Sequence, residues 1–283
     1  MKLIKPSYTI IEQDFGIEGI YKQIELAGRT CYKSEDKITE TSAKEFVDRM
    51  IRSGHGAMLE HGTVYLKCPG SSVFTLVQRH GYWDYEKNSY SKVIHNLELR
   101  DGVFPIDNCY ITTNYRVLVE NGWLDDLKYI CEPTEIHEKR ITVKFICDRG
   151  VSHEFVRHRV FSFAQESTRY CNYSKDKFNN EITFIQPCWV LDEDNSVHAE
   201  NIFVDSLCKA EKDYFELLKE GWKPQQARAV LPNALKTELV MTGFISDWEH
   251  FFKLRDVIAA HPQARELAEP LHKEFIKLGY CKE

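Results

Sequence analysis

The amino-acid sequence predicts an α+β fold: a single compact domain in which helices flank a mixed or antiparallel sheet. Several segments place apolar residues at helical spacing, whereas residues 141–147 alternate mostly with period two, as a half-buried strand does. The helices and strands do not alternate regularly, which argues against a parallel sheet. We find no linker or internal repeat, so residues 1–283 are treated as one domain.

The first half of the chain contains one clear helix and one short strand. Ser42-x-x-Glu45 has the form of a capping box, apolar residues follow at helical spacing, and Gly54 ends the helix. Residues 63–68 have the pattern of a strand. The stretch from about residue 69 to 138 is irregular and rich in Tyr, Asn and Gly, with one candidate strand at 109–115.

The second half begins with the strand at 141–147. After it we expect a helix at 152–156 capped by Ser152, a helix at 203–218 closed by Gly221, and a short helix at 225–231 opened by Pro224. Ser246-x-x-Glu249 predicts a capping box for a helix running to Ile258. Pro262 starts a last helix that ends at Gly279 and is bent at Pro270.

Composition indicates an ordinary globular protein of the cytoplasm. About 43% of residues are hydrophobic and 28% are charged, and no apolar run approaches the roughly 20 residues of a membrane helix. The nine cysteines are widely spaced without a Cys-x-x-Cys pair, which supports neither a disulfide framework nor a zinc site. We therefore expect no metal and no membrane association.

Charge is distributed unevenly. The formal net charge is −6, yet residues 140–177 hold eight Lys/Arg and four Asp/Glu, a local balance of 8 − 4 = +4. A cationic pocket in an acidic protein suits a small anionic ligand better than nucleic acid.

The densest group of chemically active residues lies at 157–170, Arg-His-Arg-Val-Phe-Ser-Phe-Ala-Gln-Glu-Ser-Thr-Arg-Tyr. Guanidinium groups bind phosphate through paired donors, and hydroxyl groups add further donors. The alternative is a solvated basic turn paired with Glu154 and Glu166. The residues alone leave both interpretations open.

Six positions in this stretch, Arg157, His158, Arg159, Ser162, Ser167 and Arg169, resemble the signature of the flavin-dependent thymidylate synthases. Three further segments are similar to the same family in the same order: 54–61 (Gly-His-Gly-Ala-Met-Leu-Glu-His), 227–232 (Ala-Arg-Ala-Val-Leu-Pro), and 251–255 with 261–267. The resemblance covers about residues 27–67 and 141–278, so residues 69–138 are expected to be an insertion of unassigned role.

The resemblance implies methylation of dUMP to dTMP, with methylenetetrahydrofolate as carbon donor and FAD reduced by NADPH as hydride carrier. Arg255 would be the catalytic residue, stabilising negative charge on the uracil. The residues implied for FAD are His55, Glu60, Arg157, His158, Arg159, Gln165, Ser246, His250 and His261. Those implied for the nucleotide are Glu154, Arg157, Gln165, Glu166, Ser167, Thr168, Arg169, Arg228 and Arg255. Family sites form between the subunits of a homotetramer.

The sequence departs from the family pattern at four positions on the flavin side: Cys31, Ala57, Glu154 and Ala164. For Arg255 there is a simpler alternative. Trp248, Phe251, Phe252 and Arg255 lie on one helix face, so the arginine side chain could serve merely to cover that aromatic stripe.

Two other motifs and one other function are weaker interpretations of the sequence. His153 and His158 are five residues apart, not the four that a zinc-protease helix requires. Pro187-Cys188 is weak support for a thiol nucleophile. The rival function is a non-enzymatic nucleotide- or RNA-binding protein that uses the basic stretch at 140–177.

Overall fold

A four-stranded antiparallel sheet forms the centre of the computed structural model, which describes all residues except 69–79, 81, 99–105, 176–177, 192–196 and 283. Its strands, in spatial order, are β2 (Ser7–Ile11), β6 (Arg140–Asp148), β9 (Lys236–Phe244) and β7 (Ser162–Gln165). Strand β9 pairs with β6 from Arg140↔Phe244 to Asp148↔Lys236. The strand predicted at 141–147 is β6, and because helices pack on antiparallel sheets the α+β prediction is confirmed.

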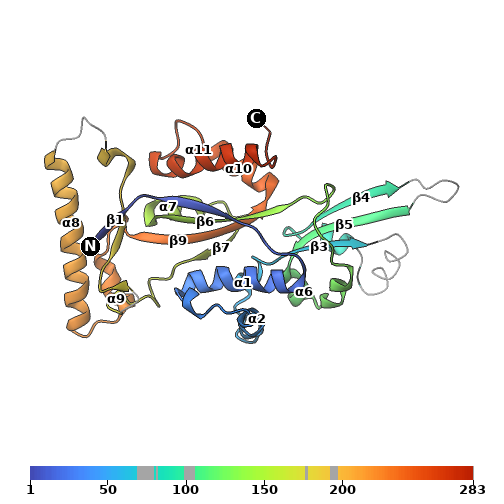
Figure 1. The fold of residues 1–283 in the computed structure, drawn as a ribbon, viewed down its shortest axis with the longest axis horizontal. Coiled ribbons are helices and arrows are strands. Elements are labelled where there is room, and N and C mark those ends of the chain that lie inside the picture. Colours follow the sequence, from blue (N-terminus) through green and yellow to red (C-terminus); the bar gives the residue numbers. More distant parts are fainter. Residues whose placement is uncertain (69–79, 81, 99–105, 176–177, 192–196, 283) are drawn as a thin grey trace.

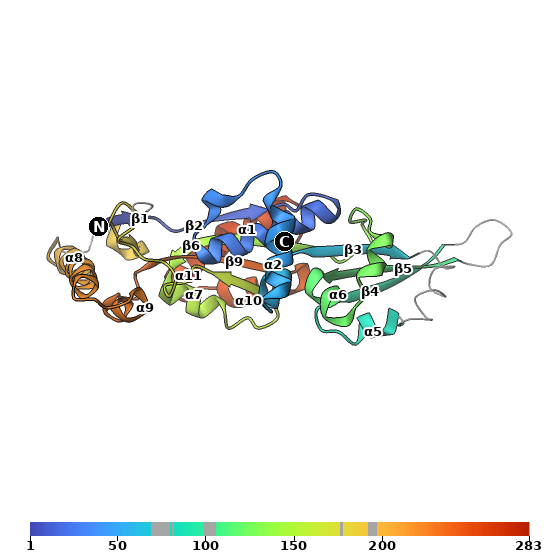
Figure 2. The ribbon, with the colours of Figure 1, turned by 90° about the horizontal axis from the view of Figure 1, so that it is seen from below.

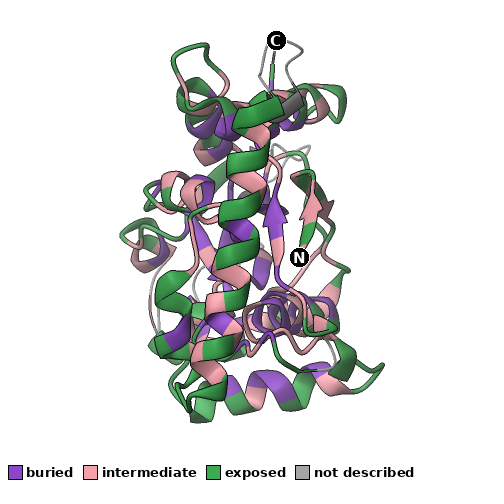
Figure 3. Cartoon of the chain, turned by 90° about the vertical axis from the view of Figure 1, so that its left-hand side faces the viewer, coloured by how far each residue is buried: buried purple, intermediate pink, exposed green. Residues whose placement is uncertain are grey.

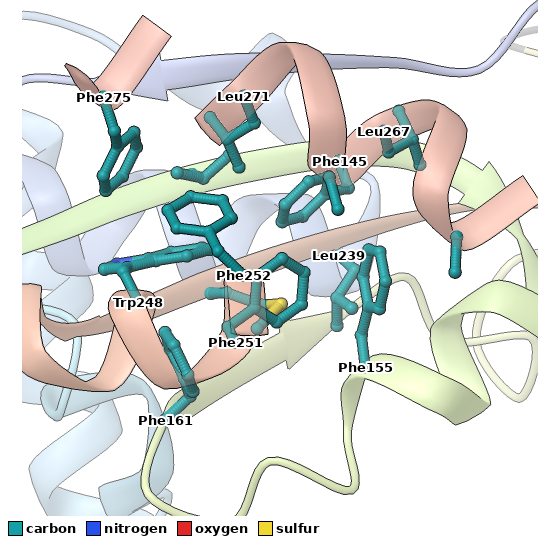
Figure 4. Close-up of a cluster of buried hydrophobic side chains, with 14 of the residues drawn as sticks. Phe145, Phe155, Phe161, Leu239, Trp248, Phe251, Phe252, Leu267, Leu271 and Phe275 are labelled. Atoms are coloured by element: carbon teal, nitrogen blue, oxygen red, sulfur yellow. The ribbon is translucent and has the colours of Figure 1, made fainter. Parts of the chain in front are cut away.

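Helices cover both faces of the central sheet (Figure 1). On one face lie α1 (Gly16–Tyr32) and α2 (Ser42–Arg52); on the other lie α7 (Arg149–Phe155), α10 (Ile245–Arg255) and α11 (Pro262–Lys277). The second face carries the aromatic core of Figure 4, in which Phe145 of β6 meets Phe155 of α7 and Phe251 of α10. The Phe145 and Phe155 rings are edge to face with centroids 5.0 Å apart.

Smaller units extend the molecule at both ends (Figures 1 and 2). At one end a second antiparallel sheet has the order β3 (Thr63–Cys68), β5 (Ile106–Asn114), β4 (Lys92–Glu98). At the other, β1 (Lys2–Ile4) pairs in parallel with β8 (Thr183–Ile185). The long helix α8 (Val197–Lys219) lies beside this pair, and its outer face is exposed (Figure 3).

Short elements connect these layers. They are η1 (Glu35–Lys37), α3 (Gly56–Leu59), α5 (Tyr82–Glu86), α6 (Tyr115–Asn121), η2 (Leu124–Tyr129), η4 (Cys188–Leu191), α9 (Pro224–Ala227) and η5 (Arg228–Val230). The helix expected at 225–231 is therefore two short turns, α9 and η5. The candidate strand at 109–115 is most of β5, and the strand at 63–68 is β3.

The three predicted serine caps are wrong, although each helix exists. Thr41 is the N-cap of α2, and the Ser42 hydroxyl accepts from the backbone N–H of Thr39 instead. In α7 the carboxylate of Asp148 accepts from the N–H of Val151 at 2.6 Å, so the helix begins one turn before Ser152. In α10 Phe244 is the N-cap, and the Ser246 hydroxyl donates to Glu138.

Candidate active site

The 157–170 stretch runs from the end of α7 through a turn into the edge strand β7 and the turn beyond it. Some of its side chains are buried and others are exposed. Ser162 is buried on β7, where its hydroxyl accepts from the guanidinium of Arg140 at 3.2 Å. Arg157 and Arg159 lie in the turn and are exposed, with 71% of the Arg157 side chain accessible. The serine therefore fixes the strand, and the arginines remain available to a ligand.

Arg255, at the end of α10, is held by three polar contacts. Its Nε donates to Nε2 of His158 at 3.0 Å, one terminal nitrogen donates to the Glu154 carboxylate at 2.6 Å, and the other donates to the Glu154 carbonyl at 2.7 Å. Its side chain is 14% exposed. A guanidinium group that only covered the aromatic stripe would not need these partners. Three of its five N–H donors are engaged, which leaves two for a substrate.

The electrostatics of this cluster keep Glu154 ionised and His158 neutral. The hydrogen bond from Arg255 lowers the pKa of Glu154, so this carboxylate is ionised. Burial, and then the charge of Arg255, lowers the pKa of His158 to about 4. Because Nε2 of the neutral ring accepts from Arg255, the ring proton is on Nδ1. The His250 ring lies 6.2 Å from that of His158, and the exposed guanidinium of Arg157 is 3.5 Å from Glu154.

A second group of predicted residues surrounds a hollow of about 250 Å³ near the end of β7. Thr168 and Arg228 line it together with Arg149, and the Arg228 guanidinium donates to the Thr168 hydroxyl at 2.8 Å. One terminal nitrogen of Arg149 is buried without a hydrogen-bond partner among the described residues. Sequence reasoning did not assign Arg149; the signal that could have found it was its place in the 140–177 basic stretch. Neither Arg157 nor Arg255 lines this hollow.

A third group joins the 54–61 segment to the signature. The Tyr32 hydroxyl lies 3.1 Å from Nδ1 of His55, and the Tyr32 ring lies 5.6 Å from that of Tyr170. The guanidinium of Arg169 lies over the Tyr170 ring at 5.6 Å. The backbone N–H of Ser167 donates to the Cys31 carbonyl at 3.0 Å. The sequence placed His55 and Arg169 in one site but did not identify Tyr32 as the link.

Several other predicted residues are engaged inside the protein. Glu166 is 2% exposed, and its carboxylate accepts from Lys236 at 2.8 Å. The Gln165 amide donates to Ser152 at 2.8 Å and to Thr237 at 3.2 Å. Roles for Glu166 and Gln165 in substrate or cofactor binding stay predictions.

The last two predicted residues are Ser246 and His261, and of these His261, after Arg255, contributes to the lowered pKa of Glu154. Ser246 lines a different hollow of about 420 Å³ with Glu138 and Glu249, and His261 is the N-cap of α11, 6.0 Å from the ring of Trp189. Their role in flavin binding also stays a prediction.

The donor chemistry of the exposed turn fits a cofactor with a pyrophosphate. Arg157 and Arg159 present guanidinium groups to solvent. His55, five residues before Glu60, is also exposed. Within the described part of the chain, no three His, Cys, Asp or Glu side chains are placed to hold a metal ion. No described helix is both long and apolar enough to cross a membrane.

Comparison with known proteins gives a consistent set of relatives. The profile of the family described as thymidylate synthase complementing protein matches residues 17–96 and 127–278. A flavin-dependent thymidylate synthase from Corynebacterium glutamicum is 33% identical over 275 residues, which cover 91% of this chain and 76% of that protein. One from Pyrococcus abyssi is 30% identical over 156 residues, which cover 48% of this chain and 62% of that protein. The chain thus spans less than two thirds of the archaeal relative.

Among solved structures, a UMP/dUMP methylase from Streptomyces cacaoi aligns over 98% of this chain and 93% of its own. Its sequence identity is 18% and its TM-score is 0.43, too low to support an argument about fold or function.

Proposed function

The chain belongs to the thymidylate synthase complementing protein family, and from this premise we propose that it methylates dUMP to dTMP. Methylenetetrahydrofolate is the carbon donor, and FAD reduced by NADPH carries the hydride. The observation that supports this most strongly is the arrangement around Arg255, in which Glu154 and His158 fix the guanidinium and two donors remain available. The protein acts in the cytoplasm.

Arg255 polarises the uracil ring. As the ring loses its N3 proton, negative charge spreads onto the adjacent oxygens, and a fixed guanidinium stabilises this charge without having to reorganise. Glu154 and the neutral ring of His158 hold Arg255 in place on the protein side. With its pKa lowered to about 4, His158 is not a proton donor near neutral pH.

The phosphate of dUMP lies among cations at the other end of the nucleotide. Arg228 and Thr168 share a hollow of about 250 Å³, and Ser167 and Arg169 are in the same turn as Thr168. Arg157 would contact both nucleotide and flavin, and Arg159, His158, His55 and His250 would hold the FAD, which would supply the hydride. No enzyme nucleophile is required.

We further propose that the site is completed in a homotetramer. None of the residues that line the hollow beside Arg228 is among the residues that contact Arg255, namely Glu154 and His158. The side chains of Arg157, Arg159 and Arg169 are exposed. A neighbouring subunit would bring complementary groups together.

The test is an absorption spectrum of the purified protein, followed by dUMP turnover with folate and NADPH. We expect about one FAD per subunit and formation of dTMP. A colourless preparation that takes up no added FAD would contradict the proposal and favour the nucleotide- or RNA-binding alternative.

A further inference from the structure

Helix α6 contacts the segment expected to bind flavin, although it comes from a part of the chain that the family profile does not match. Residues 97–126 lie outside that profile, and α6 falls within them. The backbone N–H of Tyr115 donates to the Gly62 carbonyl at 2.8 Å, directly after the 54–61 segment. The neighbouring Arg116 donates to the Glu60 carboxylate at 2.6 Å.

Glu60 is held at both its carboxylate and its carbonyl. Its side chain is 13% exposed and pairs with Arg116, whose own side chain is 37% exposed. Its carbonyl accepts from the buried guanidinium of Arg140 at 3.0 Å. A partly buried ion pair of this kind restricts the carboxylate to one orientation, unlike a fully exposed pair.

Gly56 provides the space that Arg116 occupies. A Cβ atom at position 56 would lie 3.0 Å from Nε of Arg116 and 3.3 Å from the Glu120 carboxylate. The arginine therefore lies across the start of α3, and its Nε donates to the Glu120 carboxylate at 2.7 Å. The contact between α6 and the 54–61 segment is thus built from Arg116 and Glu120 of α6 together with Gly56 and Glu60.

An unpaired carboxylate at Glu60 would repel an anionic cofactor and would cost free energy where it is partly buried. We propose that Arg116 is a positioning residue of the flavin site: it compensates the charge of Glu60 and orients its carboxylate toward the cofactor. This inference rests on the proposed function, and it gives the segment outside the family profile a role in flavin binding.

The experiment is a titration of flavin-free protein with FAD, followed by flavin fluorescence, for wild type and for Arg116→Met, Glu60→Gln and the double variant. We expect Arg116→Met to weaken FAD binding about tenfold, within the range of measured coupling between contacting charged residues. Arg116→Lys keeps the charge and should recover most of the affinity. Because Arg116 acts through Glu60, Arg116→Met should cause no further loss when Glu60 is already Gln.

Lys44→Met is the matched control, because it removes a cation from the exposed Lys44–Asp48 pair on α2 and should leave FAD affinity unchanged. A purely structural Arg116 would lower the melting temperature without changing FAD affinity, which would overturn the inference. Equal losses in both Glu60 backgrounds would also overturn it. If Arg116→Met does not fold, Arg116→Gln, which removes the charge but keeps a polar side chain, is compared in the same two Glu60 backgrounds. Wild-type protein that binds no FAD would overturn the proposed function itself, and this inference with it.

Discussion

The contacts of the Arg255 side chain determine what a lysine in its place would lose. Its Nε and both terminal nitrogens have separate partners on Glu154 and His158. An ammonium group cannot reproduce this planar set of donors or present two more to the uracil. We expect Arg255→Lys to lower dUMP turnover on the order of 10² to 10³, about 3 to 4 kcal/mol.

Turnover of Arg255→Lys should be measured with its flavin spectrum and melting temperature. The FAD should stay bound, because Arg159 and His55, which are proposed to hold it, make no hydrogen bond to Arg255, and His158 is the one proposed flavin residue that does. Arg52→Lys, on the exposed end of α2, is the control and should be silent. Near-normal turnover would refute the catalytic role, and parallel loss of flavin and stability would indicate a structural arginine.

His158 makes the stability of the protein sensitive to acid. Its ordinary pKa of 6.5 is lowered to about 4 in the folded protein, so the unfolded chain binds more protons between these values. Stability is therefore complete above about pH 6.5 and is lost as the pH falls toward 4. At pH 5 the loss is about 2 kcal/mol.

This loss can be isolated with His158→Gln, which keeps an acceptor for Arg255 but does not titrate. Denaturant unfolding at pH 7.5 and at pH 5 should show that wild type loses about 2 kcal/mol more than the variant. The buried His61 has its pKa lowered to about 3 and is present in both proteins, so it cancels in the difference. An identical pH dependence for the two proteins would show that folding does not lower the pKa of His158.

At the scale of helices and strands, Asn114 provides a test of how α6 begins. Its side chain is fully buried and accepts from the N–H of Val117 at 3.1 Å. Asn114→Ala removes this cap and should lower the free energy of unfolding by about 0.5 to 2 kcal/mol. Asn201→Ala, on an exposed face of α8, is the comparison and should not destabilise. A loss confined to Asn201→Ala would contradict the assignment of the cap.

Alternation and helical spacing predict the strands and helices whose burial is regular. Strands β3 and β6 lie where the sequence pattern predicts them, and every residue of both is buried or half-buried. The caps fail for a physical reason: a serine at the right spacing is only one of several polar groups near a helix start. Asp148 is already at the turn before Ser152, so the N–H groups of α7 are satisfied earlier.

The candidate site is predictable only where its residues are adjacent in sequence. The signature at 157–170 identifies the arginines, but the bond between Glu154 and Arg255 joins residues 101 positions apart. The same holds for Arg116 and Glu60, which are 56 apart. Such pairs depend on how the helices pack, which no spacing in a single sequence encodes. Between residues 69 and 138 the sequence predicts only the strand at 109–115; the described elements β4, α5, α6 and η2 are not predicted, because this stretch shows no steady period.

The scale of the whole molecule offers the test of subunit cooperation. If Arg169 and Arg255 serve one pocket from different chains, co-expressed Arg169→Ala and Arg255→Ala subunits should form some intact pockets. Random assembly gives about a quarter of wild-type activity, because each intact pocket needs two unmodified contributions. The measurement is turnover of the mixed oligomer, with light scattering to determine its mass.

Each variant alone and the double variant serve as controls and should remain inactive. Mixed protein with no recovered activity, or an active monomer, would show that one chain completes the site.

The position of β9 in the sheet also has a consequence for how the protein is synthesised. Strands β6 and β7 leave the ribosome well before β9, yet β9 lies between them and pairs with both. Until β9 emerges, the nascent chain holds two strands whose inner edges have no partner, and such edges promote misassociation. Translation of residues 166–235 therefore sets the time for which the unfinished sheet is exposed, and a pause in this stretch should favour aggregation over folding.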